Sequence, residues 1–303
     1  MSDIALDAGE RFANVGELEI CYQTFGRPSD PPLLLIAGLG AQMILFEDDF
    51  CAALAERGLW VVRYDNRDVG KSSPIDWKSP ADAGAAVAEG KKGERIAAPY
   101  LLKDMAADAV GLMDALGIAR AHVVGASMGG MIAQEVAIHW PERVRSLTSI
   151  MSTTGDPRLP PPTPAVMTIF TQPPPKTAEE YVEANVAAWL VFRGAGYPED
   201  EKRDRERAIR AAKRGFNPEG GQRQMLAVYA SGSRKKTLPS VRAPTLVIHG
   251  ADDPLLPLAA GEDTAASISG AKLVVLPRMG HALPLAVWPR VIDEIMQLVK
   301  RAP

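Results

Sequence analysis

Short apolar runs alternate with longer amphipathic segments along the first half of the chain and again near its end. The runs at 33–37, 59–64 and 122–125 are continuous, which is typical of strands covered on both faces. The predicted strands are 16–26, 33–37, 59–64, 122–125, 144–151, 244–250 and 271–276. The predicted helices are 46–57, 101–116, a segment ending near 140, and 288–300. This alternation predicts a mostly parallel sheet with helices on both faces.

The alternation stops between residues 154 and 241, where proline clusters interrupt the chain and no buried strand is predicted. Helices are predicted there at 178–193, 199–214 and 219–231. The densely charged segment 199–214 is interpreted as a solvated outer face. Because the strand pattern resumes at residue 244, residues 154–241 are predicted to be a helical cap, inserted into a core domain of residues 1–153 and 242–303. Residues 79–98 are predicted to be an irregular excursion.

A glycine-containing turn follows the apolar run at 122–125. The pentapeptide 125–129, Gly-Ala-Ser-Met-Gly, joins a predicted buried strand to a helix, which is the arrangement of a nucleophile elbow. The tight turn lifts the serine hydroxyl out of the sheet, and glycines on either side let strand and helix approach closely. Ser127 is therefore the candidate nucleophile.

A serine nucleophile needs a base that takes its proton and an acid that orients the base. The loop after the predicted strand 244–250 carries two adjacent aspartates. Asp253 is preferred as the acid because it is the Asp of Gly-x-x-Asp before a Pro/Leu stretch, while Asp252 and Asp156 remain alternatives. His281 lies on a glycine-containing loop after the last predicted strand, and it is the candidate base.

The charge that forms on the substrate oxygen needs two hydrogen-bond donors. The backbone N–H of Met128, directly after the nucleophile, is one candidate. The backbone N–H of Leu39, on the loop after the predicted strand 33–37, is the other. Together they are the predicted oxyanion hole.

Bulk composition excludes several classes of function. The chain has 303 residues, of which 47% are hydrophobic, and this is enough to bury a large core. A net charge of −3 gives no footprint for nucleic acid, and no apolar run is long enough to span a bilayer. Cys21 and Cys51 are expected to pack as small apolar groups, and His122, His139 and His249 are interpreted as structural, so neither a metal nor a cofactor is predicted. The polar N-terminus suggests a cytoplasmic protein, and a homo-oligomer is compatible with the sequence.

The chain resembles the α/β-hydrolase family along nearly all of its length outside the cap. The motifs that carry the resemblance are the pentapeptide at 125–129, Arg-Tyr-Asp-Asn-Arg-Asp-Val-Gly-Lys-Ser at 63–72, Gly-Ala-Asp-Asp at 250–253 and Met-Gly-His at 279–281. Within that family, the segment 63–72 and the Met-Gly-His-Ala-Leu-Pro ending are similar to the aclacinomycin methylesterase family. The resemblance implies an α/β-hydrolase fold, with an eight-stranded, mostly parallel sheet and an inserted helical cap.

The resemblance also implies a triad of Ser127, Asp253 and His281, with Leu39 and Met128 as oxyanion donors. The expected reaction is hydrolysis of a carboxylic ester of a small to medium, apolar molecule through an acyl-enzyme. Enol-lactone hydrolases, C–C bond hydrolases and perhydrolases use the same triad and remain alternatives. A non-catalytic, ligand-binding protein of this fold is a further alternative.

The predicted cap would form the roof of the substrate pocket. Trp189, Phe192, Met225 and Tyr229 are the candidate lining residues from this segment. A serine at the elbow disfavours dehalogenases and epoxide hydrolases, which attack with an aspartate at that position. The predicted partner is therefore a small-molecule ester.

Overall fold

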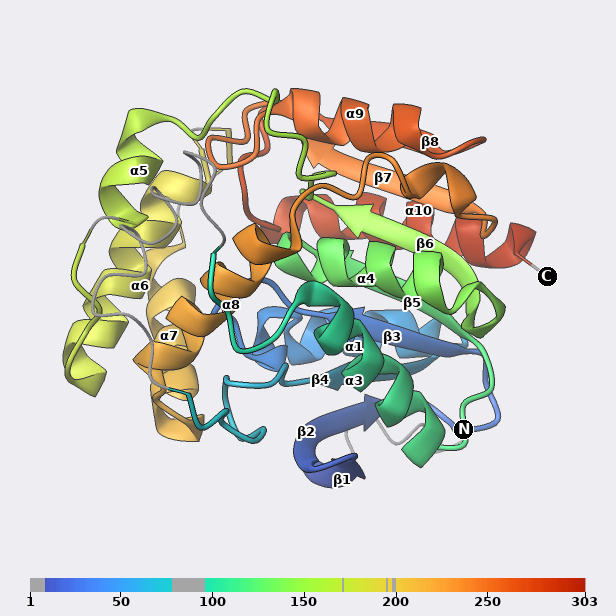
Figure 1. Cartoon of the computed structure of the whole chain (residues 1–303), viewed down its shortest axis with the longest axis horizontal. Helices are drawn as coiled ribbons and strands as arrows, with labels where there is room; N and C mark the ends of the chain where they lie inside the picture. Colours follow the sequence, from blue (N-terminus) through green and yellow to red (C-terminus); the bar gives the residue numbers. More distant parts are fainter. Residues whose placement is uncertain (1–8, 78–95, 171, 195, 198–199, 303) are drawn as a thin grey trace.

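A computed structural model of the protein describes residues 9–77, 96–170, 172–194, 196–197 and 200–302. Within these residues, eight strands form one sheet in the order β1-β2-β4-β3-β5-β6-β7-β8, which crosses the molecule between layers of helices (Figure 1). The strands are β1 (Arg11–Val15), β2 (Leu18–Phe25), β3 (Pro32–Ile36), β4 (Trp60–Tyr64), β5 (Ala121–Ala126), β6 (Val144–Ile150), β7 (Thr245–Gly250) and β8 (Lys272–Leu276). Strands β3 to β8 pair in parallel, and β2 pairs antiparallel with both β1 and β4. The predicted α/β-hydrolase sheet is confirmed.

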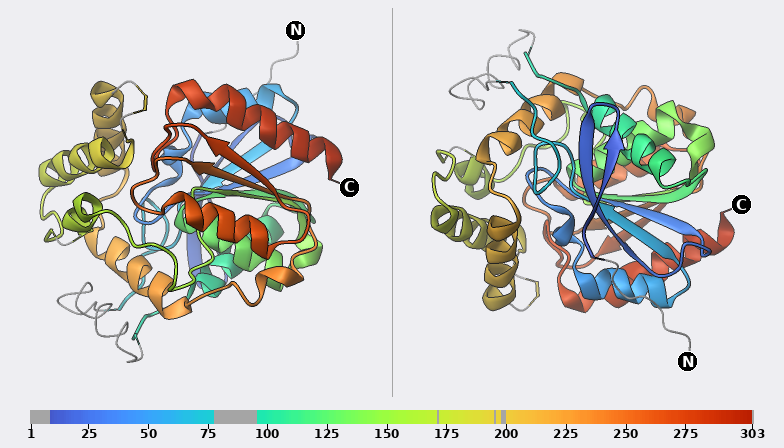
Figure 2. Two further views of the ribbon diagram at one scale, coloured as in Figure 1. Left: turned by 90° about the horizontal axis from the view of Figure 1, so that it is seen from above. Right: turned by 90° about the horizontal axis from the view of Figure 1, so that it is seen from below.

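Helices cover both faces of the sheet (Figure 2). One face carries α3 (Leu102–Ala115), α4 (Met128–His139) and α9 (Leu258–Ser267), and the other carries α1 (Asp48–Glu56) and α10 (Trp288–Arg301). Successive residues of β3 show why both faces need cover. Leu34 and Ile36 belong to the core beneath α3 and α4, whereas Leu33 and Leu35 belong to the core beneath α1 and α10. Since side chains alternate along a strand, a continuous apolar run fills both cores at once.

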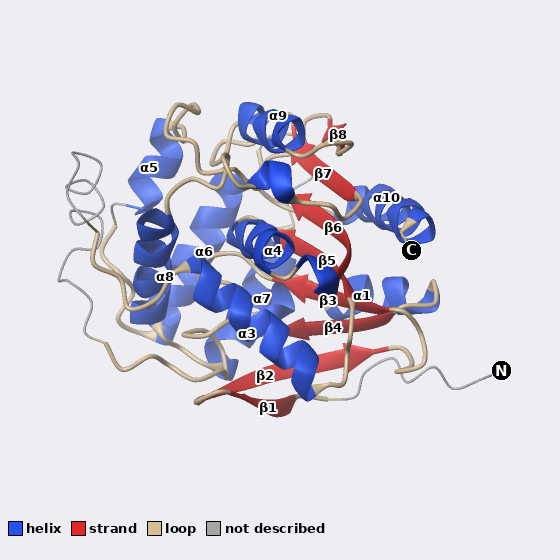
Figure 3. Cartoon of the chain, turned by 45° about the vertical axis from the view of Figure 1, so that its right-hand side comes forward, coloured by secondary structure: helices blue, strands red, loops and turns tan. Residues whose placement is uncertain are grey.

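Between β6 and β7, the described part of the chain forms four α-helices, and we refer to residues 154–241 as the cap segment. The helices are α5 (Pro164–Phe170), α6 (Ala178–Phe192), α7 (Glu201–Arg214) and α8 (Pro218–Ser231). They lie beyond the carboxyl ends of the parallel strands (Figure 3). In open α/β sheets this edge is where ligands bind. The division of the chain into a core domain and a cap domain stays a prediction.

Three elements have no counterpart among the predicted ones. Strand β1 lies at the edge of the sheet and is mostly exposed, so it carries no apolar run. Helices α5 and α9 are short, and α9 consists mainly of small and polar residues that give no helical stripe. The predicted excursion at 79–98 falls, apart from its last three residues, outside the described residues. Cys21 and Cys51 are both buried and are not joined in a disulfide, as predicted.

Candidate active site

The turn at Ser127 has the strained backbone of a nucleophile elbow. Ser127 has a φ of 57° and a ψ of −121°, a conformation that most residues avoid. A Cβ on Gly125 would lie 2.0 Å from the carbonyl oxygen of Gly129, and a Cβ on Gly129 would lie 2.0 Å from that of Ile36. Only glycine fits at both positions, because β5, α4 and β3 approach each other here. The local sequence therefore forces the serine to the carboxyl edge of the sheet.

Three side chains from distant parts of the chain meet at this edge. The Nε2 atom of His281 lies 2.9 Å from the Oγ of Ser127. Its Nδ1 atom lies 2.7 Å from the Oδ2 of Asp253. With the proton on Nδ1, the imidazole donates to the carboxylate and accepts from the serine hydroxyl. The predicted nucleophile, base and acid are thus within hydrogen-bond reach of one another.

Of the two adjacent aspartates after β7, Asp253 is the one beside the base. Its side chain is fully buried, and its Oδ1 accepts hydrogen bonds from the backbone N–H groups of Leu255 and Leu256 at 2.9 and 2.8 Å. These bonds leave Oδ2 directed at His281. Asp252 is exposed, and Asp156 instead forms ion pairs with neighbouring basic residues.

The loop that carries His281 is held by the end of α6. The backbone N–H of His281 donates to the carbonyl of Phe192 at 2.6 Å, and that of Gly280 donates to the carbonyl of Arg193 at 3.1 Å. A Cβ on Gly280 would lie 2.3 and 2.4 Å from those two carbonyl oxygens. The Phe192 ring also lies edge-on to the imidazole, with centroids 6.1 Å apart. We call these contacts of Phe192 and Arg193 with Gly280 and His281 the backbone junction.

A second histidine lies against Asp253, and the sequence did not reveal this contact. His249 is fully buried; its Nε2 lies 2.7 Å from the carbonyl oxygen of Leu256 and 3.6 Å from the Oδ2 of Asp253. A carbonyl can only accept, so Nε2 carries a proton. Burial lowers the pKa of His249, which keeps the ring neutral. The only sequence signal is its position, immediately before the loop of the acid.

Of the two predicted oxyanion donors, Met128 follows Ser127 in the chain, and Leu39 lies on a loop close to Ser127 in space. Leu39 and Ser127 line the same cavity, and a Cβ on Gly38 would lie 3.2 Å from the Cβ of Ser127. Met128 is the first residue of α4, and the N–H groups in the first turn of a helix have no acceptor within it. The oxyanion roles of both backbone groups stay predictions.

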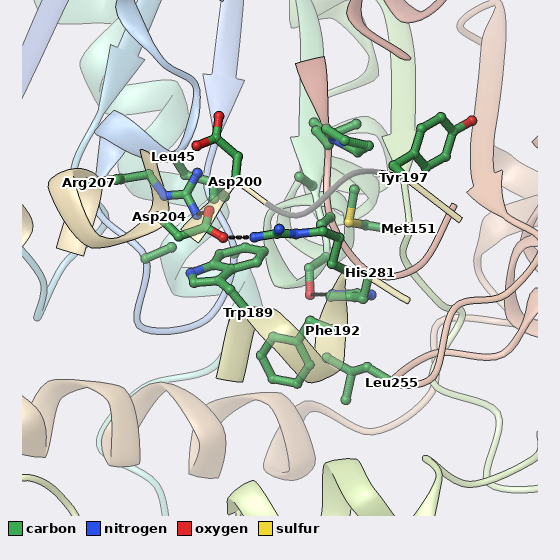
Figure 4. Close-up of a pocket in the computed structure, with 18 of the residues that line it drawn as sticks. Leu45, Met151, Trp189, Phe192, Tyr197, Asp200, Asp204, Arg207, Leu255 and His281 are labelled. Carbon is green, nitrogen blue, oxygen red and sulfur yellow. Dashed lines mark hydrogen bonds and ion pairs between the residues drawn. The ribbon is translucent and has the colours of Figure 1, made fainter. Parts of the chain in front are cut away.

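A cavity of about 490 Å³ opens over Ser127 and His281 (Figure 4). Most of its wall is apolar. The apolar residues include Leu39, Leu45, Met151, Ile169, Trp189, Phe192 and Leu255. Trp189 and Phe192 therefore line the cavity as predicted, but the prediction is wrong for Met225 and Tyr229. Met225 packs in the apolar cluster around Leu226, and Tyr229 is 41% exposed.

One side of the cavity is charged, which corrects the interpretation of 199–214 as a solvated face. Arg203, Asp204 and Arg207 of α7 line the cavity together with Glu47. Asp204 pairs with Arg193 and, at 2.8 Å, with Arg207. Glu47 accepts from Arg203 at 2.8 Å and from Arg207 at 3.0 Å.

Charged residues of α7 lie both on its exposed face and on its buried face, and the sequence pattern alone does not distinguish the two. Lys202 and Glu206 are 86% and 65% exposed, whereas Asp204 is buried among its partners. Residues three and four apart share one helical face, so a helix rich in charged residues can place some of them in solvent and others against buried partners. Arg207 also stacks over the ring of Trp189, with its guanidinium carbon 4.6 Å from the ring centroid.

Comparison with known proteins agrees with this architecture. Residues 31–285 match the protein family described as alpha/beta hydrolase fold. Rhodomycin D methylesterase DnrP from Streptomyces peucetius is 32% identical over 290 residues, which cover 89% of this chain and 91% of the relative. DauP from Streptomyces sp. (strain C5), also a rhodomycin D methylesterase, is 32% identical over 296 residues, covering 91% and 93%. The chain belongs to the alpha/beta hydrolase fold family.

Solved structures of other family members have the same fold. The enol-lactonase from Burkholderia xenovorans LB400 superposes with a TM-score of 0.71 at 22% identity, covering 96% of this chain and all of that one. The predicted family and its resemblance to methylesterases are confirmed. The prediction of an enzyme of the carboxylic-ester hydrolase class agrees with the methylesterase relatives. In the part of this alpha/beta hydrolase that the structure describes, no helix has the length and apolar character to cross a membrane.

Proposed function

We propose that this alpha/beta hydrolase cleaves a carboxylic ester through an acyl-enzyme on Ser127. The observation that carries the proposal is the continuous contact from Asp253 through His281 to Ser127, with distances of 2.7 and 2.9 Å. A ligand-binding protein of this fold would need no such aligned set. The methylesterase names of the relatives support an ester as the substrate.

Each group has one role in the proposed cycle. His281 Nε2 accepts the proton of Ser127 as the hydroxyl attacks the ester carbonyl, and it then gives that proton to the leaving alcohol. Asp253 stabilises the imidazolium and holds the ring in place. Water subsequently attacks the acyl-enzyme, with His281 again as base, and releases the acid. The backbone N–H groups of Leu39 and Met128 would receive the negative charge in both steps.

The cavity favours a small to medium, apolar substrate. Its volume of about 490 Å³ is within the usual range for small-molecule sites, and its walls beside Ser127 are mostly apolar. Because both relatives at 32% identity are named methylesterases, methyl esters of apolar acids are the first substrates to test.

The direct test measures release of p-nitrophenol from short-chain p-nitrophenyl esters and release of acid from methyl esters. We expect activity in the wild type and a loss of about 10⁴-fold or more in Ser127→Ala. A fluorophosphonate probe should label the wild-type protein at Ser127. A folded wild type that is neither labelled nor active would refute the proposal.

The two adjacent aspartates provide a matched control. Asp253→Asn should lower kcat by several orders of magnitude, because the amide no longer favours the tautomer with the proton on Nδ1. Asp252→Asn makes the same chemical change at an exposed neighbour and should keep wild-type activity. Equal effects of the two substitutions would contradict the assignment of the acid.

A further inference from the structure

The motif at 63–72 resembles the family most closely, yet its acidic residues do not line the catalytic cavity. Asp65 and Asp68 follow β4, and both side chains are fully buried. Buried carboxylates are costly unless they are paired and hydrogen-bonded. The ion-pair partners of these two residues, Arg214 and Arg223, come from the cap segment.

Asp68 pairs with α8. Its carboxylate accepts from Nη2 of Arg223 at 2.8 Å and from the hydroxyl of Tyr100 at 2.6 Å. The side chain of Asn217, the N-cap of α8, donates to the carbonyl of Asp68 at 3.0 Å. A Cβ on Gly220 would lie 1.9 Å from the same carbonyl oxygen, so the first turn of α8 lies directly on this loop.

Asp65 pairs with the end of α7. Nη2 of Arg214 donates to its carboxylate at 2.8 Å, and the Arg214 side chain is 7% exposed. The backbone N–H of Met43 donates to the same carboxylate, also at 2.8 Å. We call the pairs Asp65–Arg214 and Asp68–Arg223 the ionic junction. It sets the position of α7 and α8 over the core.

The register of α8 places Gln224, the residue after Arg223, against the loop that follows β3. Gln224 is fully buried. Its Oε1 accepts from the backbone N–H of Gly40 at 2.8 Å, and its Nε2 donates to the carbonyl of Arg67 at 2.8 Å. One amide thus joins the loop after β3 to the loop after β4. Both hydrogen bonds are short, and both ends of the amide are used.

The rest of the loop after β3 is held as well. The side chain of Asn66 donates to the carbonyl of Ala37 at 3.1 Å, and the backbone N–H of Ala41 donates to the carbonyl of Gly38 at 3.2 Å. Leu39 lies between these fixed points, and its N–H is the predicted oxyanion donor. An oxyanion donor acts only when it lies about 2.7–3.1 Å from the position of the developing charge. A small shift at Gly40 therefore reaches the donor through a single residue.

We propose that Gln224 is a positioning residue of the oxyanion hole, held in register by the ionic junction. The cap segment would then act on the chemistry as well as on the shape of the pocket. This inference rests on the proposed function, because it requires a reaction in which negative charge develops beside Leu39.

The test compares Gln224→Met with Gln222→Met, which makes the same change two residues away on a half-exposed face of α8. Rates are expressed per active site, counted by fluorophosphonate labelling, so that a misfolded fraction does not lower them. For p-nitrophenyl acetate, whose acyl group is too small to need the cap, we expect Gln224→Met to lower kcat about 10–100-fold with little change in KM. Gln222→Met should behave as wild type.

Two further measurements separate positioning from loss of stability. A trifluoromethyl ketone forms a tetrahedral adduct with its oxyanion in the hole, so its Ki should rise by the same factor as kcat/KM falls. Hydrogen exchange in the segment 37–42 should become faster in Gln224→Met, because the Gly40 N–H loses its acceptor. If methionine prevents folding, Gln224→Asn, which is one methylene shorter and cannot keep both bonds, replaces it.

The outcomes are distinct. Wild-type kcat per active site in both Gln224 variants, with an unchanged Ki, would overturn the inference and leave the esterase proposal intact. An inactive wild type would refute the proposed function. In that case, the exchange measurement alone would decide whether Gln224 holds the loop, and unchanged exchange would overturn that as well.

Discussion

Two of the contacts between the cap segment and the core are built in opposite ways. The ionic junction uses long side chains, in which Arg214 and Arg223 reach buried aspartates after β4. The backbone junction uses the main chain, in which Gly280 and His281 donate to the carbonyls at the end of α6. The ionic junction holds the loops around the predicted oxyanion hole, and the backbone junction holds the loop of His281, the predicted base.

The difference lies in what each junction demands of the sequence. An ion pair in a buried place needs specific residue types and several hydrogen bonds, so it leaves a conspicuous motif. Gly70 and Ser72 belong to the same motif for this reason: a Cβ on Gly70 would lie 2.2 Å from the Asp65 carboxylate, and the Ser72 hydroxyl donates to the Asp65 carbonyl at 2.6 Å. The backbone junction needs only the absence of a side chain. Its sequence trace is a few glycines.

The largest effect is expected at the ionic junction. Asp68→Asn tolerates the positive φ of 74° at this position, but it leaves the buried guanidinium of Arg223 without its buried charge partner and with only the exposed Glu219. We expect the free energy of unfolding to fall by about 3–5 kcal/mol, measured by urea denaturation. Asp114→Asn is the control, since Asp114 is 64% exposed in its pair with Arg143 and should cost at most about 1 kcal/mol. Equal costs would show that the ionic junction does not carry the cap segment.

An intermediate effect is expected at the backbone junction. Gly280→Ala places a methyl group against the carbonyls of Phe192 and Arg193, so the loop of His281 must shift away from α6. If the proposed function holds, kcat/KM should fall about 10–100-fold, equivalent to about 1.4–2.8 kcal/mol, because the base is misplaced. The loss should be as large for p-nitrophenyl acetate as for longer esters.

The control for this substitution is Gly221→Ala in α8, where the nearest atom would be 3.9 Å from the new Cβ. It should keep full activity. A loss confined to long esters in Gly280→Ala would mean that the junction shapes the pocket and does not position the base.

The smallest expected effect is a dependence of the free energy of unfolding on pH. Burial alone would raise the pKa of Glu10, but hydrogen bonds from Lys71 and Arg214 lower it below its ordinary value. A lowered folded pKa contributes stability that is present above the unfolded pKa, near 4.5, and is lost as the pH falls through the folded pKa. Glu10→Gln should therefore cost about 0.5–1 kcal/mol at pH 6, and this cost should shrink as the pH falls below 4.5, measured as urea midpoints.

Glu142→Gln, at an exposed glutamate in the 3-10 turn Pro141–Arg143, is the control for the acid effect and should show no such change with pH. The two backbone hydrogen bonds of the other junction contain no titratable group. A cost of Glu10→Gln that does not shrink as the pH falls would mean that packing, and not charge, holds Arg214.

Much of the fold and the positions of the site were predictable because their signals are local. Continuous apolar runs mark buried strands wherever they occur, and a serine between two glycines after such a run can hardly form anything but a tight turn. The loops of Asp253 and His281 were found because each follows a predicted strand. Parallel strands bring their carboxyl ends to one edge, so topology alone gathers these loops.

Other features depend on the direction in which a side chain or a helix face points, and a residue pattern does not contain this information. Asp252 and Asp253 are identical in type, and only the backbone donors at Leu255 and Leu256 select which one faces His281. The cavity wall on α7 depends on how that helix is rotated, and Met225 and Tyr229 were misplaced because no residue of α8 lines the cavity.

The sequence by itself determined the order of strands and helices, the elbow at Ser127 and the residues available for a triad, because these follow from short-range sterics and burial. Tertiary structure alone decided that His249 lies beside Asp253 and that the carbonyls at the end of α6 accept hydrogen bonds from the backbone of the His281 loop. It also decided that an amide of α8 supports the loop after β3. The physical reason is that every residue carries the same backbone carbonyl, and a residue pattern does not state how a helix is rotated. Which carbonyls and which helix faces make contacts is decided only when separate elements pack together.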